Sequence, residues 1–207
     1  MPLGASRVEG GRPLYESYRY ELWKQLQANQ FNFDFVGTQT DDSSYPTFKG
    51  QIFDPDHEGR GGWTSTEILV GLGDWLHQIE RVDVVLLSSP GGNDALQGLS
   101  YSSAIANVYA IVDILQNANP SMTILVERMA PAHSNAMTST LSDFMDQMHR
   151  DVVKMAQVKT TSTSKIIVVD MYTDFQDHWL ADDVHYNSTG AKFIATRYYN
   201  ELVNVLQ

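Results

Sequence analysis

The sequence predicts an α/β fold in which helices alternate with the strands of a parallel sheet. Short apolar, β-branched runs recur along the chain, and longer stretches with helical periodicity separate them, which is the pattern of βαβ units. The length of 207 residues suits one domain, and a chain of this size buries about 70% of its unfolded surface without needing disulfides. We therefore expect a single domain over residues 1–207.

Five apolar runs are the expected strands. They cover residues 1–3, 31–36, 82–88, 122–127 and 165–171. No apolar run approaches the roughly 18 residues that a membrane-spanning helix needs. We therefore expect no insertion into a membrane.

Five helices are expected between and after these strands. The first, 14–28, follows Pro13, a residue favoured in the first turn of a helix. The second, 64–79, opens with Thr64 and Glu67 at the spacing of a capping box. The remaining three cover residues 101–117, 139–157 and 188–206.

Composition excludes several classes of chemistry. The chain has no cysteine, which removes structural disulfides, thiolate metal sites and cysteine nucleophiles. It has 25 acidic against 14 basic residues, a formal net charge of −11. Nucleic-acid binding relies on clustered Lys and Arg, so we expect no nucleic-acid partner.

The longest connection runs over residues 37–62. Structureless loops above about 12–15 residues are uncommon, and function in α/β sheets sits in the loops at the carboxyl ends of the strands. We expect this segment to pack on the body of the protein and to contribute to a site.

Ser6 is the first candidate for chemistry. It follows the first expected strand in the segment GASRVEG, which would place its hydroxyl at the carboxyl edge of the sheet. A serine hydroxyl needs a base to become nucleophilic, and histidine has a suitable pKa. His185 supplies such a base ahead of the last helix, and Asp182 stands three residues before it, where it would orient the imidazole.

Two glycine-containing segments offer hydrogen-bond donors for a developing oxyanion. Asn93 follows the third strand in SSPGGND, and Gly62 ends the segment DHEGRGG just before the second helix. Ordinary turns are the alternative for both, because Gly and Asn are common in turns.

Together these four places resemble the SGNH hydrolases, also called GDSL esterases and lipases. The family has a serine block, a glycine, a G-x-N-D block and a D-x-x-H pair in this order, matched here by Ser6, Gly62, residues 91–94 and residues 182–185. The segments MPLGASRVEG, NFDFVGTQ and DHEGRGGWT are most similar to carbohydrate esterase family three, whose members remove acetyl groups from xylan.

This resemblance implies a flavodoxin-like three-layer α/β/α sandwich with a five-stranded parallel sheet in the order 2-1-3-4-5. It implies a catalytic triad of Ser6, Asp182 and His185, and an oxyanion hole from the N–H groups of Ser6 and Gly62 and the amide of Asn93. It also implies chemistry without a metal or other cofactor, and a secreted or periplasmic location, with a cytoplasmic one as the alternative.

The sequence departs from the family pattern at several positions. Ala5 replaces the aspartate of G-D-S, and Tyr186 replaces a proline that often follows the histidine. Asp183 stands where relatives carry glycine and is the alternative to Asp182, as Gly61 is to Gly62.

Arg7, Trp63 and Trp179 flank the proposed site and are candidates to line the substrate pocket. A structural salt link to Glu9 or Asp56 is the alternative for Arg7 and for Arg60.

The predicted activity is hydrolysis of short acyl esters, with an O-acetylated carbohydrate as substrate and an acyl-enzyme intermediate. A general short-chain esterase or lipolytic enzyme is the first alternative. A relative without catalysis that binds carbohydrate is the second. The sequence does not indicate the oligomeric state.

Overall fold

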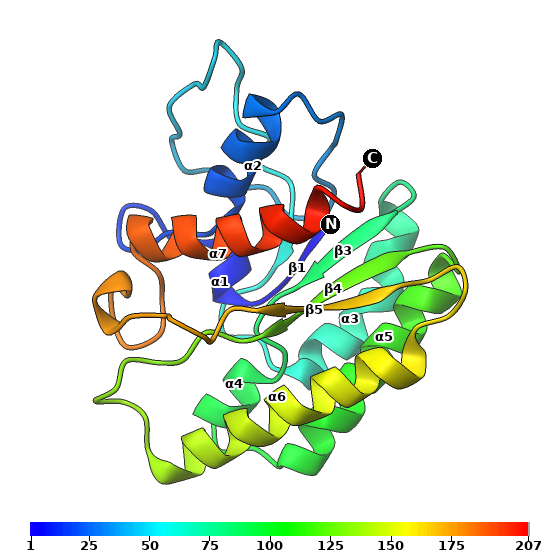
Figure 1. Cartoon of the computed structure of the whole chain (residues 1–207), viewed down its shortest axis with the longest axis vertical. Coiled ribbons are helices and arrows are strands. Elements are labelled where there is room, and N and C mark those ends of the chain that lie inside the picture. Colours follow the sequence, from blue (N-terminus) through cyan, green and yellow to red (C-terminus); the bar gives the residue numbers. More distant parts are fainter. Residues whose placement is uncertain (207) are drawn as a thin grey trace.

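A five-stranded parallel sheet forms the centre of the structure, a computed structural model that describes residues 1–206 (Figure 1). The strands are β1 (Pro2–Gly4), β2 (Glu58–Gly59), β3 (Val84–Leu87), β4 (Thr123–Arg128) and β5 (Ile166–Asp170). Their order across the sheet is β2-β1-β3-β4-β5, and each neighbouring pair is parallel. The strand order 2-1-3-4-5 is thus confirmed.

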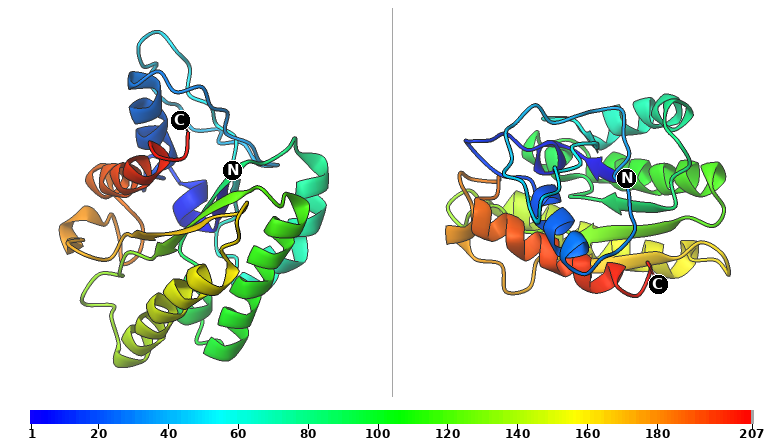
Figure 2. Two further views of the ribbon diagram at one scale, coloured as in Figure 1. Left: turned by 45° about the vertical axis from the view of Figure 1, so that its right-hand side comes forward. Right: turned by 90° about the horizontal axis from the view of Figure 1, so that it is seen from above.

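Helices cover both faces of this sheet and give three layers (Figures 1 and 2). One face carries α3 (Ser65–Gln78), α5 (Tyr101–Ala118) and α6 (Ser139–Lys159), and the other carries α2 (Arg19–Ala28) and α7 (Ser188–Leu202). Three short helices lie in the connections: α1 (Ser6–Glu9), α4 (Gly92–Leu96) and the 3-10 turn η1 (Asp177–Trp179).

Two apolar cores follow from the alternation of side chains along the strands. In β3, Val85 and Leu87 point to the core under α3, α5 and α6, whereas Leu86 points to the core under α2 and α7. All three side chains are almost fully buried. Both faces of the central strands are therefore covered, as expected for a parallel sheet.

The strand expected at residues 31–36 is wrong, because the sheet's second strand is β2, only two residues long. The backbone N–H of Phe35 is bonded at 2.6 Å to the Asp54 carboxylate and not to a neighbouring strand. The alternating aromatic residues of this segment are nevertheless part of the core: Phe31, Phe33 and Phe35 pack under α2 and α7.

Gly59 explains why β2 lies where it does. A Cβ there would meet the backbone N of Glu9 at 2.4 Å, so only glycine lets β2 approach α1 this closely. The rest of the expected connection at residues 37–62 forms no regular helix or strand before β2.

The helix predictions differ from the structure mainly at their ends. The capping box of Thr64 and Glu67 is present at the start of α3. The first long helix begins at Arg19 and not at residue 14, because residues 11–15 form a turn closed by a Gly11–Tyr15 bridge. The last helix ends at Leu202, earlier than expected.

The carboxyl ends of β1, β3, β4 and β5 meet on the side of the sheet where α1 and α4 lie (Figure 1). Within residues 1–206, no helix combines the length and the apolar character needed to cross a membrane.

Candidate active site

Ser6, His185 and Asp182 form a continuous hydrogen-bonded row at this edge of the sheet. The Ser6 Oγ lies 2.8 Å from the Nε2 of His185, and the Nδ1 of His185 lies 2.7 Å from the Oδ2 of Asp182. The chain separates Ser6 from His185 by almost its whole length, yet β1 and the loop before α7 bring them together. A base hydrogen-bonded to a hydroxyl and oriented by a carboxylate is the arrangement that activates a serine for nucleophilic attack.

Local chemistry shapes the loop that carries the histidine. The Oδ1 of Asp182 accepts hydrogen bonds from the backbone N–H groups of Val184 at 2.8 Å and His185 at 2.7 Å, a turn typical of aspartate. Burial alone would raise the pKa of Asp182, but these two N–H groups and the His185 ring outweigh it, so the pKa lies below its usual value. Asp182, and not Asp183, bonds the imidazole.

Tyr15 covers one face of the His185 ring, a contact that the sequence analysis missed. The two ring centroids are 4.0 Å apart and the ring planes differ by 20°. Gly11 lies behind Tyr15, where a Cβ would come within 2.5 Å of the tyrosine ring. The imidazole is therefore held at its edge by Asp182 and on its face by Tyr15.

Three donor groups lie in the segments expected to form an oxyanion hole. The backbone N–H of Ser6 opens α1, and Gly62 lies in the turn before α3 with a left-handed φ of +77°. No acceptor among residues 1–206 pairs with the N–H of Gly62, Gly61 or Ser6. Asn93, in α4, donates one amide hydrogen to the Trp63 carbonyl at 2.7 Å, and an amide nitrogen carries a second.

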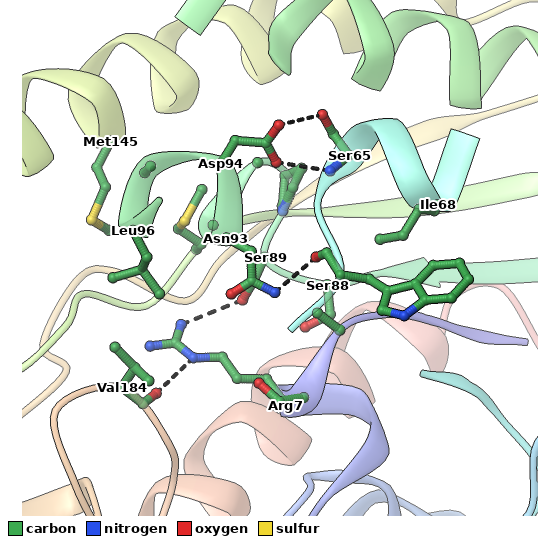
Figure 3. A pocket seen from close by; sticks show the side chains of 18 of the residues that line it. Arg7, Ser65, Ile68, Ser88, Ser89, Asn93, Asp94, Leu96, Met145 and Val184 are labelled. Carbon is green, nitrogen blue, oxygen red and sulfur yellow. Dashed lines mark hydrogen bonds between the residues drawn. The ribbon is translucent and has the colours of Figure 1, made fainter. Parts of the chain in front are cut away.

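Asp94 holds the two donor segments together. Its buried carboxylate accepts hydrogen bonds from the N–H of Ser65 at 2.8 Å and from the Ser65 hydroxyl at 2.7 Å (Figure 3). This ties α4, which carries Asn93, to the start of α3 at Ser65, three residues after Gly62.

A cavity of about 70 Å³ opens beside Ser6. Arg7, Trp63 and Asn93 line it, and Figure 3 shows Leu96 and Met145 on the wall facing Arg7. Further apolar lining comes from Met129, Ala132 and Leu141. The cavity thus joins a polar mouth to an apolar interior.

Trp179, also expected at the substrate, is not among the lining residues. Its ring packs against Phe193, with centroids 4.8 Å apart, and against Phe175 at 5.6 Å. This aromatic cluster between η1 and α7 accounts for its position.

The salt links considered for the two arginines do not form. Arg7 bonds backbone carbonyl groups and Ser89, and Arg60 pairs with Glu58 at 2.8 Å. Neither reaches Glu9 or Asp56 in the part of the chain described. Residues 1–206 also contain no group of three or more His, Asp or Glu side chains placed to hold a metal ion.

Known proteins similar to this chain share both its sequence pattern and its fold. Residues 8–193 match the family described as GDSL-like Lipase/Acylhydrolase. A carbohydrate esterase family 3 structure from Talaromyces cellulolyticus is similar at 25% identity and a TM-score of 0.85, covering 100% of this chain and 96% of that one.

Two further solved structures are similar to this chain over its whole length. A mutant acetyl esterase with an acetate ion gives 26% identity and a TM-score of 0.84, covering 100% and 96% of the two chains. A Clostridium thermocellum family 3 carbohydrate esterase gives 28% identity and 0.80, covering 100% and 95%. Among curated protein sequences nothing matches.

Proposed function

The chain belongs to the GDSL-like lipase/acylhydrolase family and is a serine esterase, and from this premise we propose that it removes O-acetyl groups from carbohydrate. Ser6 is the nucleophile, His185 the general base and acid, and Asp182 the residue that orients His185. The N–H groups of Ser6 and Gly62 and the amide of Asn93 stabilise the oxyanion.

In the first half-reaction the Ser6 Oγ attacks the ester carbonyl carbon while its proton passes to the Nε2 of His185. The carbonyl oxygen becomes an oxyanion that the three donors stabilise. When the tetrahedral intermediate collapses, the bond to the leaving alcohol breaks and His185 returns the proton to the alcohol oxygen. Ser6 then carries the acyl group.

Water completes the cycle by the same route. His185 takes a proton from a water molecule, and the oxygen of that water attacks the acyl carbon. The bond to the Ser6 Oγ breaks, the proton on Nε2 returns to Ser6, and the carboxylic acid leaves. Throughout, Asp182 stabilises the imidazolium without accepting the proton itself.

One observation carries the assignment of roles: the aligned contacts of 2.8 Å from Ser6 to His185 and 2.7 Å from His185 to Asp182. Acetyl as the acyl group and carbohydrate as the alcohol are supported by the similar structures, which are an acetyl esterase with acetate and two carbohydrate esterases.

Replacement of the nucleophile tests this proposal. Ser6→Ala should abolish release of acetate from acetylated xylan and hydrolysis of p-nitrophenyl acetate, with little change in Tm. The exposed Ser121→Ala serves as the matched control and should behave as the wild type. Turnover by Ser6→Ala at the wild-type rate would remove Ser6 from the mechanism.

The cavity favours a second candidate, a general short-chain esterase. Its volume of about 70 Å³ is several times the roughly 10–15 Å³ that one water-sized sphere occupies on this measure, and its interior is apolar. Such a space suits an acyl chain longer than acetyl. Hydrolysis rates on p-nitrophenyl acetate, butyrate and hexanoate distinguish the acetylesterase from the general short-chain esterase. For an acetyl-specific enzyme the rate should drop steeply from the acetate to the butyrate.

A further inference from the structure

Arg7, the residue after the nucleophile, is bound on several sides by backbone carbonyl groups. Its Nε donates to the carbonyl of Val184 at 2.8 Å, and its Nη1 donates to that of Ala130 at 2.8 Å. The remaining contacts are Nη2 to the Pro131 carbonyl at 3.1 Å and Nη1 to the Ser89 hydroxyl at 3.3 Å. Arg7 thus joins α1 to the loops after β3, β4 and β5.

These contacts leave the guanidinium little capacity to bind a substrate. A guanidinium has five N–H donors, and the four bonds above use four of them. Arginine typically binds a carboxylate or phosphate through two parallel donors, and only one of the five N–H groups is left. Although Arg7 lines the cavity, its donors point into the protein, toward Val184 and Ser89 (Figure 3).

A buried carboxylate holds Ser89, one of the hydrogen-bond partners of Arg7. Glu127, in β4, is 0% exposed and accepts hydrogen bonds from the N–H of Ser89 at 2.7 Å and from the hydroxyl of Tyr198 at 2.8 Å. The Ser89 hydroxyl, 3.3 Å from both Glu127 and Arg7, connects the two charged side chains. The Arg7 guanidinium and the Glu127 carboxyl group are therefore linked through Ser89, in the loop after β3.

The contact with Val184 matters because Val184 directly precedes His185. The loop that carries both residues has no regular secondary structure apart from isolated bridges, and Asp182 and Asp183 on it are exposed. A shift of this loop moves the imidazole relative to the Ser6 Oγ. Arg7 bonds the loop from α1, the same helix that Ser6 opens.

We propose that Arg7 is a positioning residue for His185. By holding the Val184 carbonyl, its guanidinium fixes the imidazole within 2.8 Å of the Ser6 Oγ, and Glu127 fixes the guanidinium through Ser89. This inference rests on the proposed function, since it assigns Arg7 a role in the same triad.

Kinetics of an arginine truncation test the inference. Arg7→Ala should lower kcat on p-nitrophenyl acetate by about 10²-fold, the effect of misplacing a catalytic group by about 1 Å, with KM changed less than about threefold. Arg128→Ala is the matched control, because Arg128 pairs with Asp170 at 3.2 Å on neighbouring strands. The control should keep the wild-type kcat.

Chemical rescue separates positioning from general stabilisation. Guanidinium chloride at tens of millimolar, far below denaturing concentrations, should raise the kcat of Arg7→Ala at least fivefold in a saturable manner. Sodium chloride at the same concentration should not. Rescue is expected only if a guanidinium in this place restores the geometry.

A spectroscopic readout does not depend on turnover. The Nδ1–H of His185, bonded to Asp182, should give a downfield proton NMR signal in the wild type that is broadened or lost in Arg7→Ala. If Arg7→Ala does not fold, Arg7→Lys takes its place, because it keeps the charge but not the fork of donors and should also lose the sharp signal.

Wild-type kcat and an unchanged signal in a folded Arg7 variant would overturn the inference, as would a lost kcat that guanidinium does not restore. Failure of the proposed function has a different signature: Ser6→Ala would then hydrolyse the ester as fast as the wild type, while the NMR comparison of Arg7 variants would still report on His185.

Discussion

We expect the stacking of Tyr15 on His185 to contribute to catalysis. Aromatic stacking contributes about 0.5–1.5 kcal/mol beyond burial, so Tyr15→Leu should lower kcat/KM on p-nitrophenyl acetate by about two- to tenfold. Tyr15→Phe keeps the ring and should remain within twofold of the wild type. Leu14→Ala is the control in the same turn, because Leu14 is 81% exposed. Equal losses in the Phe and Leu variants would show that the hydroxyl matters and not the ring face.

The side-chain amide of Asn93 is the third donor of the proposed oxyanion hole. Removing one oxyanion donor commonly costs a factor of about 10²–10³ in kcat, and Asn93→Ala should show a loss in that range with Tm little changed. Asn117→Ala provides the control, because Asn117 has the same side chain and is exposed near the end of α5; it should keep the wild-type kcat. An Asn93→Ala enzyme with wild-type kcat would exclude Asn93 from the oxyanion hole.

At the residue scale, the sequence predicts what depends on short spacing. The turn in which Asp182 bonds the N–H groups of Val184 and His185 is local, and the order of the blocks indicated that Ser6 belongs with it. Contacts of Tyr15 with His185 and of Arg7 with Val184 join segments far apart in the chain. No local pattern encodes those pairings.

Glu127 links three elements, and its replacement is expected to lower stability. It joins β4 to the loop after β3 through Ser89 and to α7 through Tyr198. Burial raises the pKa of Glu127, while the donors from Tyr198 and Ser89 act in the opposite direction. Glu127→Gln would place an NH₂ group among these donors and leave buried groups unpaired, at a cost of about 1–3 kcal/mol.

Urea unfolding of Glu127→Gln measures this loss of stability, and Glu80→Gln, at an exposed glutamate, is the control. We expect the free energy of unfolding to fall by 1–3 kcal/mol in the first and to stay within about 0.5 kcal/mol of wild type in the second. Equal stabilities for both variants would show that Glu127 is not a structural link.

At the element scale, the sequence patterns were sufficient to predict the presence of the long helices and of the central strands. They were not sufficient to predict the short elements. The capping box at Thr64 marked the start of α3 correctly. In contrast, β2 has only two residues, one of them the fully buried Glu58, so it carries no apolar period. The alternating aromatic residues in 31–36 indicated a strand more strongly than residues 58–59 did. Their rings are nevertheless packed into the core without any pairing of this segment to a strand of the sheet.

For the molecule as a whole, the positions of the charged side chains are more informative about the substrate than the net charge of −11. The cations near the cavity are already engaged: Arg7 by carbonyl groups, and Arg60 by Glu58 and by the ring of Trp75, 4.3 Å away. The geometry therefore favours an uncharged ester over an anionic one. The acetylated neutral sugar proposed above as the substrate meets this condition.

Stability of the whole molecule should fall in mild acid because of His57. This histidine is 2% exposed, and its Nδ1 accepts the N–H of Gly59 at 2.9 Å, which requires the neutral ring. Burial, reinforced by the positive charges of Arg19 and Arg60, lowers the pKa of His57 from 6.5 to about 3. Between these two values the unfolded chain binds one proton more than the folded chain at this site, so stability rises with pH across that window.

The contribution of His57 is isolated by comparison with His57→Asn, whose Oδ1 can replace Nδ1 as the acceptor for Gly59. Urea unfolding at pH 7, 6, 5 and 4 should show the wild type losing up to about 1.4 kcal/mol more per pH unit than this variant once the pH is below 6.5. His77→Asn, exposed on α3, is the control and should follow the wild type. If wild type and His57→Asn lost stability in parallel, protonation of His57 would not be coupled to unfolding, and acid sensitivity would have to arise from the carboxylates.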